Sequence, residues 1–306
     1  MVTPPPLWQN NHNMRSPLPR RNFLAGSAAA LALLAVPRTR AVPAGFRPLF
    51  DGRSLDGWRA IPRLPVARAP GESAPGPDSE AYRVAAAHRG EWRVEDGVIL
   101  GGQQPAGSGL GAYLITEAKF GDFELLVDAN PDWPTDTGVM VRTTPLGAQG
   151  YQIHIDYRQE GSIGTFYGNG IGNFRVRHYS FEGELEGRRV RALRPRAVPP
   201  TEPAGLAYGC PPDAFFKAWR VGEWNTLRIR CRGAIPTLTT WINDVKIAEL
   251  DAANLQREGY NRDAVAALLG PRGHIALEVH HHTPNSPERW GHGAYCRWRN
   301  LFIRDL

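Results

Sequence analysis

Short segments in which apolar and polar residues alternate recur along most of the chain, with Gly, Asn, Asp and Pro between them. Alternation with a period of two residues is typical of β-strands that bury one face. The pattern predicts strands at residues 91–100, 123–129, 138–142, 151–156, 224–232, 238–242, 245–250, 274–279 and 298–304. Many short strands of this kind predict an all-β sandwich or jelly roll, not a βαβ sheet.

Other local patterns refine this outline. Asn243-Asp244 stands between two apolar runs and predicts a tight hairpin turn. Only residues 252–269 have a convincing helical period, which predicts a helix that caps one end of the sandwich. Residues 60–90 and 182–218 are rich in Pro over part of their length and lack a strong period, so we expect two long inserted loops.

The segment 151–156 carries polar side chains that packing alone does not explain. Because successive residues of a strand point to opposite faces, Gln152, His154 and Asp156 share one face and the apolar residues share the other. The same rule places Arg142 on a face with Met140 in the segment 138–142. If these strands belong to one sheet, an amide, an imidazole, a carboxylate and a guanidinium group meet on its outer face.

A third polar face follows from the residues around the histidine run at 280–282. Glu278, His280 and His282 alternate along a predicted strand, so they share one face and the intervening histidine, His281, points to the other. An antiparallel sheet commonly has one solvated face, which is the ordinary explanation for any single residue of this kind. Imidazoles and carboxylates in combination are better suited to proton transfer or metal ligation than to solvation.

Aromatic residues in loops offer candidate stacking surfaces for a carbohydrate. Trp133 and Trp290 lie in loops near the polar strands and are the better candidates. The second insertion ends in Phe215, Phe216 and Trp219, for which packing onto the sandwich is the favoured interpretation.

The N-terminal residues have the composition of an export signal. Arg20-Arg21 precedes Phe23-Leu24, and an apolar run at 28–36 is followed by a small residue, Ala41. Paired arginines before Phe-Leu resemble a twin-arginine signal. The apolar run is too short for a stable membrane span of roughly 20 residues. We therefore expect residues 1–41 to be an export signal, with 1–13 an over-long start, and residues 42–306 to form one domain of a periplasmic or secreted protein.

Neither the net charge nor the cysteines change the predicted fold or function. The formal charge of +6 includes five arginines and no acidic residue within 1–41, so the rest of the chain carries +1. This balance argues against nucleic acid as a partner. Three cysteines, Cys210, Cys231 and Cys296, leave at least one thiol unpaired and predict no particular disulfide. No Cys/His zinc spacing and no nicotinamide or flavin motif is present, so the sequence leaves a divalent metal cofactor open.

Several segments together resemble the 3-keto-disaccharide hydrolase family. In chain order they are FRPLFDGRSLDGW (46–58), WRVEDG (92–97), FGDFEL (120–125), TGVMVR (137–142), GEWN (222–225) and WRNLFI (298–303). The resemblance implies a concanavalin- or laminarinase-like jelly-roll β-sandwich that acts on 3-oxo-glycosides, with a separate sugar 3-dehydrogenase supplying the substrate. A base then removes the proton on C2, and elimination expels the C1 substituent; a divalent metal could stabilise the enediolate.

The resemblance also assigns expected roles to the polar residues of these strands. His154 or His280 would be the base, and Asp156 and Glu278 would orient it or hold a metal. Arg142 and Gln152 would bind the substrate, together with Tyr167, Trp133 and Trp290. Glu278 and His154 depart from the residues typical of the family, which has Gln at the first position and a hydrophobic or polar residue at the second.

Two other functions remain open at this point. A non-catalytic, lectin-like carbohydrate-binding module is the stronger alternative, since the same fold serves both roles. Convergence of His154, Asp156, Glu278 and His280 in one pocket would favour an enzyme, and a flat open face would favour the binding module. A retaining β-glucanase is less well supported, because the Glu-x-Asp-x-x-Glu strand that would supply its two carboxylates is missing. A scaffold role through the inserted loops ranks third.

Overall fold

Two large antiparallel β-sheets make up most of the computed structural model, which describes residues 40–187, 189–283 and 288–306. All of these residues belong to one compact unit, Pro37–Leu306. The expected export signal at 1–41 lies almost wholly outside the described residues. Within the described part of the chain, no helix is long and apolar enough to cross a membrane.

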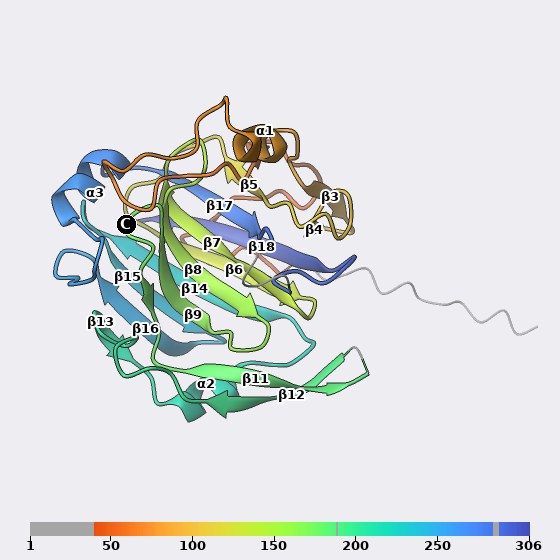
Figure 1. Cartoon of the computed structure of the whole chain (residues 1–306). Helices are drawn as coiled ribbons and strands as arrows, with labels where there is room; N and C mark the ends of the chain where they lie inside the picture. Colours follow the sequence, from red (N-terminus) through yellow and green to blue (C-terminus); the bar gives the residue numbers. More distant parts are fainter. Residues whose placement is uncertain (1–39, 188, 284–287) are drawn as a thin grey trace, which may run out of the picture. The chain divides into compact units, whose positions relative to one another are not determined.

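The larger sheet forms one layer of the sandwich (Figure 1). Its strands run in the order β13 (Leu206–Gly209), β16 (Val245–Asp251), β15 (Thr237–Ile242), β14 (Asn225–Arg232), β6 (Phe123–Pro131), β18 (Tyr295–Asp305), β4 (Val98–Gly102) and β3 (Glu91–Glu95), and β1 (Arg47–Pro48) pairs with β18. The non-consecutive neighbours show that the chain crosses repeatedly between layers, as expected for a jelly roll.

The second sheet forms the other layer. Its order is β10 (Arg175–Val176), β9 (Ile163–Asn169), β8 (Gly150–Tyr157), β7 (Thr135–Thr143), β17 (His274–Val279), β5 (Ala112–Thr116) and β2 (Trp58–Pro62). The predicted polar segments 138–142, 151–156 and 274–279 are therefore adjacent strands of one sheet, because β7 pairs with both β8 and β17.

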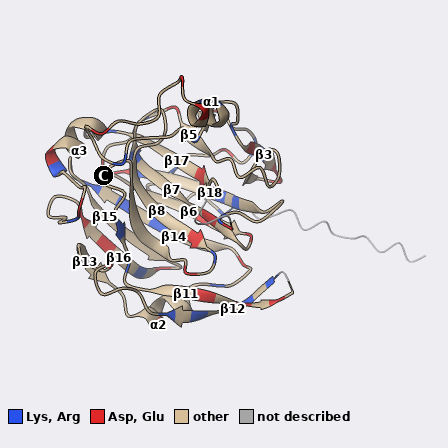
Figure 2. Ribbon diagram, viewed as in Figure 1, with Lys and Arg blue, Asp and Glu red and all other residues tan. Residues whose placement is uncertain are grey.

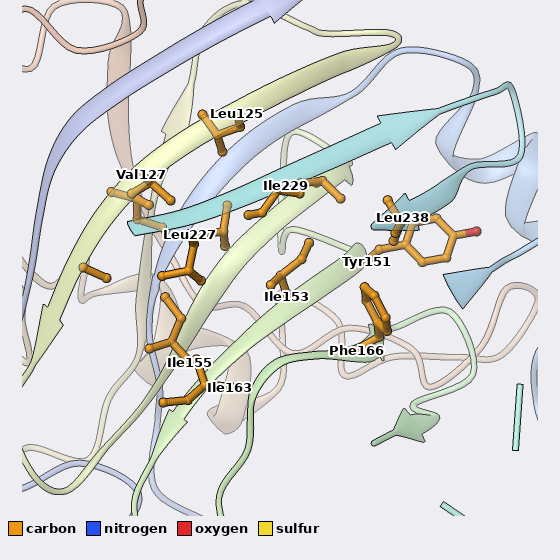
Figure 3. Close-up of a cluster of buried hydrophobic side chains, with 14 of the residues drawn as sticks. Leu125, Val127, Tyr151, Ile153, Ile155, Ile163, Phe166, Leu227, Ile229 and Leu238 are labelled. Atoms are coloured by element: carbon orange, nitrogen blue, oxygen red, sulfur yellow. The ribbon is translucent and has the colours of Figure 1, made fainter. Parts of the chain in front are cut away.

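The main hydrophobic core lies between the two layers. Alternate residues of β8 (Tyr151, Ile153, Ile155) point toward alternate residues of β6 and β14, such as Val127 and Ile229 (Figure 3). These side chains are almost fully buried, and burial of each large aliphatic group contributes roughly 1.5–3 kcal/mol. The face of the seven-stranded sheet that turns away from this core is left for the polar residues of the same strands.

Two tight turns each join a pair of neighbouring strands in the larger sheet. Asn243 and Asp244 have φ values of 46° and 68°, the left-handed conformation that a two-residue turn between β15 and β16 requires, so the predicted tight turn is confirmed. Asp96 and Gly97 also have positive φ, and they divide the predicted strand 91–100 into the hairpin β3–β4. The single strand predicted there is wrong in that respect.

The predicted helix at 252–269 is shorter in the structure. Helix α3 spans Arg262–Leu269, and Asn261 caps it by accepting a hydrogen bond from the Ala264 amide. The residues before it form turns instead. Gly259 has a φ of 75° and packs against the backbone of Gly172, a close approach that a regular helix would not allow.

The two inserted segments are partly structured. The first contains helix α1 (Glu80–Ala86), and the second contains the two-stranded sheet β11 (Ser180–Glu186) with β12 (Arg189–Arg196), together with β13 and helix α2 (Pro212–Ala218). Phe215 and Trp219 are buried and stack on each other with ring centroids 6.2 Å apart. Packing onto the sandwich, the favoured interpretation of these aromatics, is confirmed.

The three cysteines are buried and unpaired (Cys210, Cys231 and Cys296). Charged residues of both signs are interspersed over the strands of both sheets and over the β11–β12 hairpin (Figure 2).

Candidate functional site

A cavity of about 640 Å³ lies on the face of the seven-stranded sheet opposite the main core. Strands β7, β8 and β9 supply polar side chains to it, and the first inserted segment supplies an apolar part of its wall through Leu64, Pro65, Val66 and helix α1. Cavities of roughly 300–1,000 Å³ are typical of small-molecule sites. The volume is sufficient for a monosaccharide with part of its leaving group.

Strand β8 places two of the predicted residues in this cavity. Gln152 and His154 line it, while Ile153 and Ile155 between and beyond them are buried in the main core. Asp156 has the same parity but is completely buried behind the cavity, so it acts on the cavity only through its neighbours. Tyr167 on β9, the third predicted residue to line the cavity, lies beside His154.

The His154 imidazole is held in a nearly parallel stack with Tyr167. Their ring centroids are 5.7 Å apart and the planes differ by 19°. Its Nδ1 atom is buried and has no hydrogen-bond partner among the described residues. Burial, and then the positive charge of Arg175, lower the pKa of His154 to about 3. The ring is therefore uncharged at neutral pH and has a nitrogen lone pair that can accept a proton.

His280 and His281 both line the cavity, which corrects the expectation that they point to opposite faces. Strand β17 ends at Val279, so period-two alternation no longer applies to the two residues after it. Their rings stack with centroids 4.7 Å apart. Burial, with a contribution from Arg63, lowers the pKa of His280 well below its usual value and that of His281 to about 3.

The environment of His280 fixes its tautomer. Its Nδ1 atom lies 2.5 Å from the carbonyl oxygen of His281, and since a carbonyl only accepts, Nδ1 carries the proton. The lone pair of Nε2 then faces two guanidinium groups, with Nη2 of Arg63 at 3.4 Å and Nη1 of Arg289 at 3.5 Å. His282, the third histidine, also lines the cavity, and its Nε2 atom lies 2.9 Å from the Trp290 carbonyl oxygen.

Glu278 lies beneath the cavity as the counter-charge of Arg63. It is completely buried, forms an ion pair with Arg63 and accepts a hydrogen bond from the Gln152 side-chain amide. Arg63 also donates to the hydroxyl of Tyr113 at 2.5 Å. These contacts fix the Arg63 guanidinium at the cavity wall, and they keep the Glu278 carboxylate from facing a substrate directly.

A pair of buried carboxylates lies beside His280, with Oδ2 of Asp136 3.8 Å from Nε2 of His280. Asp136 on β7 and Asp156 on β8 are direct cross-strand partners, and Asp136 lines the cavity. Arg158 bridges them, with its Nε atom 2.9 Å from Asp156 and 3.7 Å from Asp136. Arg289 forms a second ion pair with Asp136. Burial, and then the nearby negative charge of Asp136, raise the pKa of Asp156 to about 7. Burial would also raise the pKa of Asp136, but His280, Arg289 and Arg158 lower it overall.

Arg142 lies away from the cavity, so the prediction that it shares the polar face with Met140 is wrong. Its φ of 54° marks a local irregularity at the end of β7, opposite a register shift in β17, and this reverses the expected direction of its side chain. The guanidinium group donates to Asp122 and to the Gly233 carbonyl oxygen, each at 3.0 Å. Arg142 therefore links the end of β7 to the residues just before β6 and just after β14.

The two tryptophans expected to stack on substrate also lie away from the cavity. Trp290 is 2% exposed, belongs to the main core and donates from Nε1 to the Ala294 carbonyl oxygen. Trp133 packs edge-on against Tyr157 with ring centroids 5.1 Å apart and lies over Gly183 of the β11–β12 hairpin. Both rings use their faces for internal packing, and the expectation of substrate stacking is wrong for this arrangement.

The donor set around the cavity does not suit a divalent cation. Among the described residues, no group of three or more His, Cys, Asp or Glu side chains is arranged as metal ligands. The carboxylates that come nearest, Asp136 and Glu278, are each already ion-paired with arginine. A cation placed between them would face the guanidinium groups of Arg63 and Arg289 at close range, which is unfavourable.

Sequence reasoning missed most of the charged residues of the cavity. Asp136 lies two residues before Gly138, on the same face, but the strand was predicted to begin only at 138. Arg63 belongs to a segment interpreted as an insertion, and Arg175 lies in the two-residue strand β10. Asn169, which lines the cavity beside Tyr113, could have been found from its spacing of two residues from Tyr167. Arg289 follows no strand pattern and carried no usable signal.

Comparison with known protein families places the chain in a carbohydrate-related family. Residues 45–304 match the family model described as a 3-keto-alpha-glucoside-1,2-lyase-like domain. Similar solved structures include a proposed glycosyl hydrolase from Parabacteroides distasonis, at 21% identity and a TM-score of 0.40, covering 70% of this chain and 90% of that one. A second proposed glycosyl hydrolase from the same organism is 16% identical with a TM-score of 0.40, covering 86% and 94%.

An endo-1,3-beta-glucanase from Streptomyces sioyaensis is 11% identical with a TM-score of 0.39, covering 88% of this chain and 100% of that one. No curated protein sequence matches the chain.

Proposed function

Because the chain belongs to the family of 3-keto-alpha-glucoside-1,2-lyase-like domains, we propose that it is an enzyme that cleaves 3-oxo-glycosides in the cavity of its seven-stranded sheet. The observation that carries this proposal is the combination of uncharged imidazoles and guanidinium groups in one cavity. The imidazoles can take up a proton, and the guanidinium groups can stabilise negative charge as it develops.

The chemistry requires a base close to C2 of the sugar. A ketone at C3 acidifies the C2 proton, and removal of that proton leaves an enolate with its charge on the C3 oxygen. The enolate electrons then expel the C1 oxygen substituent, which leaves with a proton as the free alcohol and yields a 1,2-ene-3-ketone. Addition of water to C1 of this enone gives the free 3-oxo sugar, so the sum of the steps is hydrolysis.

We assign the base to His154. Both His154 and His280 are uncharged at neutral pH, but the Nε2 lone pair of His280 already faces the guanidinium groups of Arg63 and Arg289. Those donors compete with a substrate proton for the same lone pair. No such donor contacts Nδ1 of His154 among the described residues, and we therefore assign the removal of the C2 proton to this ring.

The cluster of Arg63, Arg289 and His280 is suited to stabilising negative charge on the substrate instead of removing a proton. Two guanidinium groups converge on one imidazole nitrogen, and Glu278 and Asp136 fix their positions through ion pairs. A preorganised set of N–H donors aimed at one position stabilises the negative charge of an oxyanion. We assign to Arg63 and Arg289 the binding of the C3 oxygen, the atom on which charge accumulates. Gln152 remains a substrate contact at the cavity wall.

The carbohydrate-binding alternative is less well supported by this arrangement. His154 and His280 line one cavity, with Asp156 and Glu278 buried behind it, and the aromatic ring beside His154, that of Tyr167, is already stacked on the imidazole. A retaining glycosidase mechanism also fits poorly. It needs two carboxylates about 5 Å apart facing the sugar, whereas Asp136 is the only carboxylate among the described residues that line the cavity.

We also propose that the protein is exported and works with a separate sugar 3-dehydrogenase. The export proposal rests on the paired arginines and apolar run before residue 42. The partnership follows from the reaction, because elimination at C1 requires a ketone at C3 and the cavity contains no group that would create one. An oxidation of the 3-hydroxyl must therefore precede this step.

The direct test uses purified protein without residues 1–41 and a 3-oxo-glucoside carrying a chromogenic leaving group. Release of the leaving group, with exchange of the C2 proton for deuterium in D₂O, is the expected result. The corresponding 3-hydroxy glucoside should be inert, and a chelator should have no effect. Turnover of the 3-hydroxy glucoside, or no turnover of the 3-oxo compound, would contradict the proposal.

A further inference from the structure

More arginines than carboxylates lie around the Asp136–Asp156 pair. Three guanidinium groups, those of Arg158, Arg175 and Arg289, contact the two carboxylates of Asp136 and Asp156. The remaining arginine of the cavity, Arg63, is matched one to one by Glu278. The local count is therefore three positive charges against two negative ones, even when both carboxylates are ionised.

The excess charge is concentrated on Arg175. Arg158 holds Asp156 through two contacts, at 2.9 and 3.3 Å, and Arg289 is ion-paired with Asp136. Arg175 reaches a carboxylate only at 3.7 Å, on the same Asp156 that Arg158 already holds. Its side chain is 26% exposed and lines the cavity. Arg175 therefore points into the cavity with a charge that its protein neighbours only partly balance.

The position of Arg175 allows it to act on a ligand bound beside His154. Its positive charge is the largest charge effect on His154, and the charges of Arg63, Arg175 and Arg289 all act on Tyr167. Arg175 is the cross-strand partner of Tyr167, which stacks on His154, so the Arg175 side chain lies beside the part of the cavity that His154 lines. An uncharged glucoside would leave the Arg175 charge facing only hydroxyl groups.

We propose that Arg175 is a specificity-determining residue that binds an anionic group on the sugar, so that the preferred substrate is a glycoside of an acidic sugar such as a uronic acid. A guanidinium group matches a carboxylate or phosphate in geometry and forms charge-assisted hydrogen bonds with it. This inference rests on the proposed function, since it names the substrate class of the same cavity. It adds a charged substituent that elimination at C1 does not require.

The carboxylate pair makes this binding dependent on pH. Asp156 faces Asp136 on β7, Arg158 after β8, Arg175 on β10 and Arg289 before β18. With the pKa of Asp156 raised to about 7, this group is mostly protonated at pH 6 and mostly ionised at pH 8. Protonation removes one negative charge beside Arg175. An anionic sugar should therefore bind more tightly at pH 6 than at pH 8, while a neutral sugar should bind equally at both.

The test measures equilibrium binding, so that it does not depend on turnover. Methyl glucosiduronate, glucose 6-phosphate, methyl glucoside and inorganic phosphate are titrated into the wild-type protein by calorimetry at pH 6 and pH 8. These sugars keep their 3-hydroxyl group and cannot undergo elimination. We expect at least one of the two anionic sugars to bind about tenfold or more tightly than methyl glucoside, and to lose affinity at pH 8. The comparison of the two anionic sugars tells a carboxylate from a phosphate.

Two variants test whether Arg175 causes the preference for anionic sugars. R175Q should bring the affinities for anionic and neutral sugars within about twofold of each other. R191Q, which removes an exposed arginine from β12, should keep the preference. Equal binding of all sugars, no measurable binding of any, an unchanged preference in R175Q, or phosphate alone binding as tightly as an anionic sugar would each overturn the inference. Turnover of a neutral 3-oxo-glucoside would still support the proposed reaction, so the two proposals fail independently.

Discussion

Asp136 and Asp156 lie directly opposite each other on neighbouring strands, buried together, with Arg158 in contact with both. Two carboxylates this close cannot both ionise without mutual repulsion, so one holds its charge and the other titrates near neutral pH. The structure gives the ionised role to Asp136, which has the stronger set of positive neighbours, and the titrating role to Asp156.

This pair predicts an unusual dependence of stability on pH. The pKa of Asp156 is raised in the folded state from an ordinary 3.8 to about 7, so the folded protein binds more protons there than the unfolded chain between those values. Its contribution to stability therefore falls as pH rises from about 4 to 7. In D156N this loss disappears, and the melting temperature should decline less between pH 5 and pH 8 than in wild type, by roughly 3–6 °C.

The buried histidines change the stability with pH in the opposite direction. Their contribution must therefore be separated from that of Asp156. His154 has a folded pKa of about 3, so the unfolded chain binds the extra proton below pH 6.5 and stability rises with pH from about 3 to 6.5. The comparison of D156N with wild type cancels that contribution, because both proteins contain His154. Parallel melting curves for the two proteins across pH 5–8 would show that Asp156 does not titrate in this range.

H154Q tests the assignment of the base. Glutamine keeps polarity and approximate size but cannot take a proton from C2, so kcat on a 3-oxo-glucoside should fall by roughly 10²–10⁴. H88Q, at a histidine outside the cavity lining, should keep wild-type kcat, and circular dichroism should show both variants folded. If H154Q loses less than threefold while H280Q loses more than a hundredfold, the base is His280.

The R142Q variant tests whether Arg142 stabilises the fold or takes part in catalysis. The Arg142 guanidinium is 1% exposed and holds Asp122 and the Gly233 carbonyl oxygen, so its loss should lower the free energy of unfolding by about 1–3 kcal/mol in urea titrations. Activity on a 3-oxo-glucoside should stay within twofold of wild type, since the side chain does not reach the cavity. A large loss of kcat in a fully folded variant would restore the substrate-binding role expected from the sequence.

Replacement of Arg20 and Arg21 by lysine tests export. Recognition of paired arginines differs from a simple requirement for positive charge, so the double variant should remain in the cytoplasm while wild type reaches the periplasm or medium. Cell fractionation with immunodetection distinguishes the two. An equal distribution of both forms would argue against a twin-arginine signal.

Regular strands made part of the site predictable. In β8, alternation holds from Gln152 to Asp156, so the sequence places the first two polar residues on the cavity face and leaves the isoleucines in the core. The two-layer sandwich is predictable for the same reason, because the period of two residues is a property of the strand itself. These predictions depend only on local geometry.

The sequence-based predictions failed for residues at strand ends and outside regular strands. Arg142 takes a positive φ, which no alternation pattern reveals, and His281 follows the last residue of β17. Arg63, Arg175 and Arg289 come from an insertion, a two-residue strand and a loop. Their convergence depends on how distant segments pack, so composition and spacing along the chain could not show it. The electrostatic character of the cavity therefore emerged only from the three-dimensional structure.

The redox conditions in which this domain can fold depend on its cysteines. All three are buried and unpaired (Cys210, Cys231 and Cys296). Since no covalent cross-link holds its strands together, the same structure is accessible in reducing and in oxidising surroundings. Maturation therefore needs no thiol oxidase or disulfide isomerase. The arginines and imidazoles of the cavity can take their places whether the surroundings are reducing or oxidising.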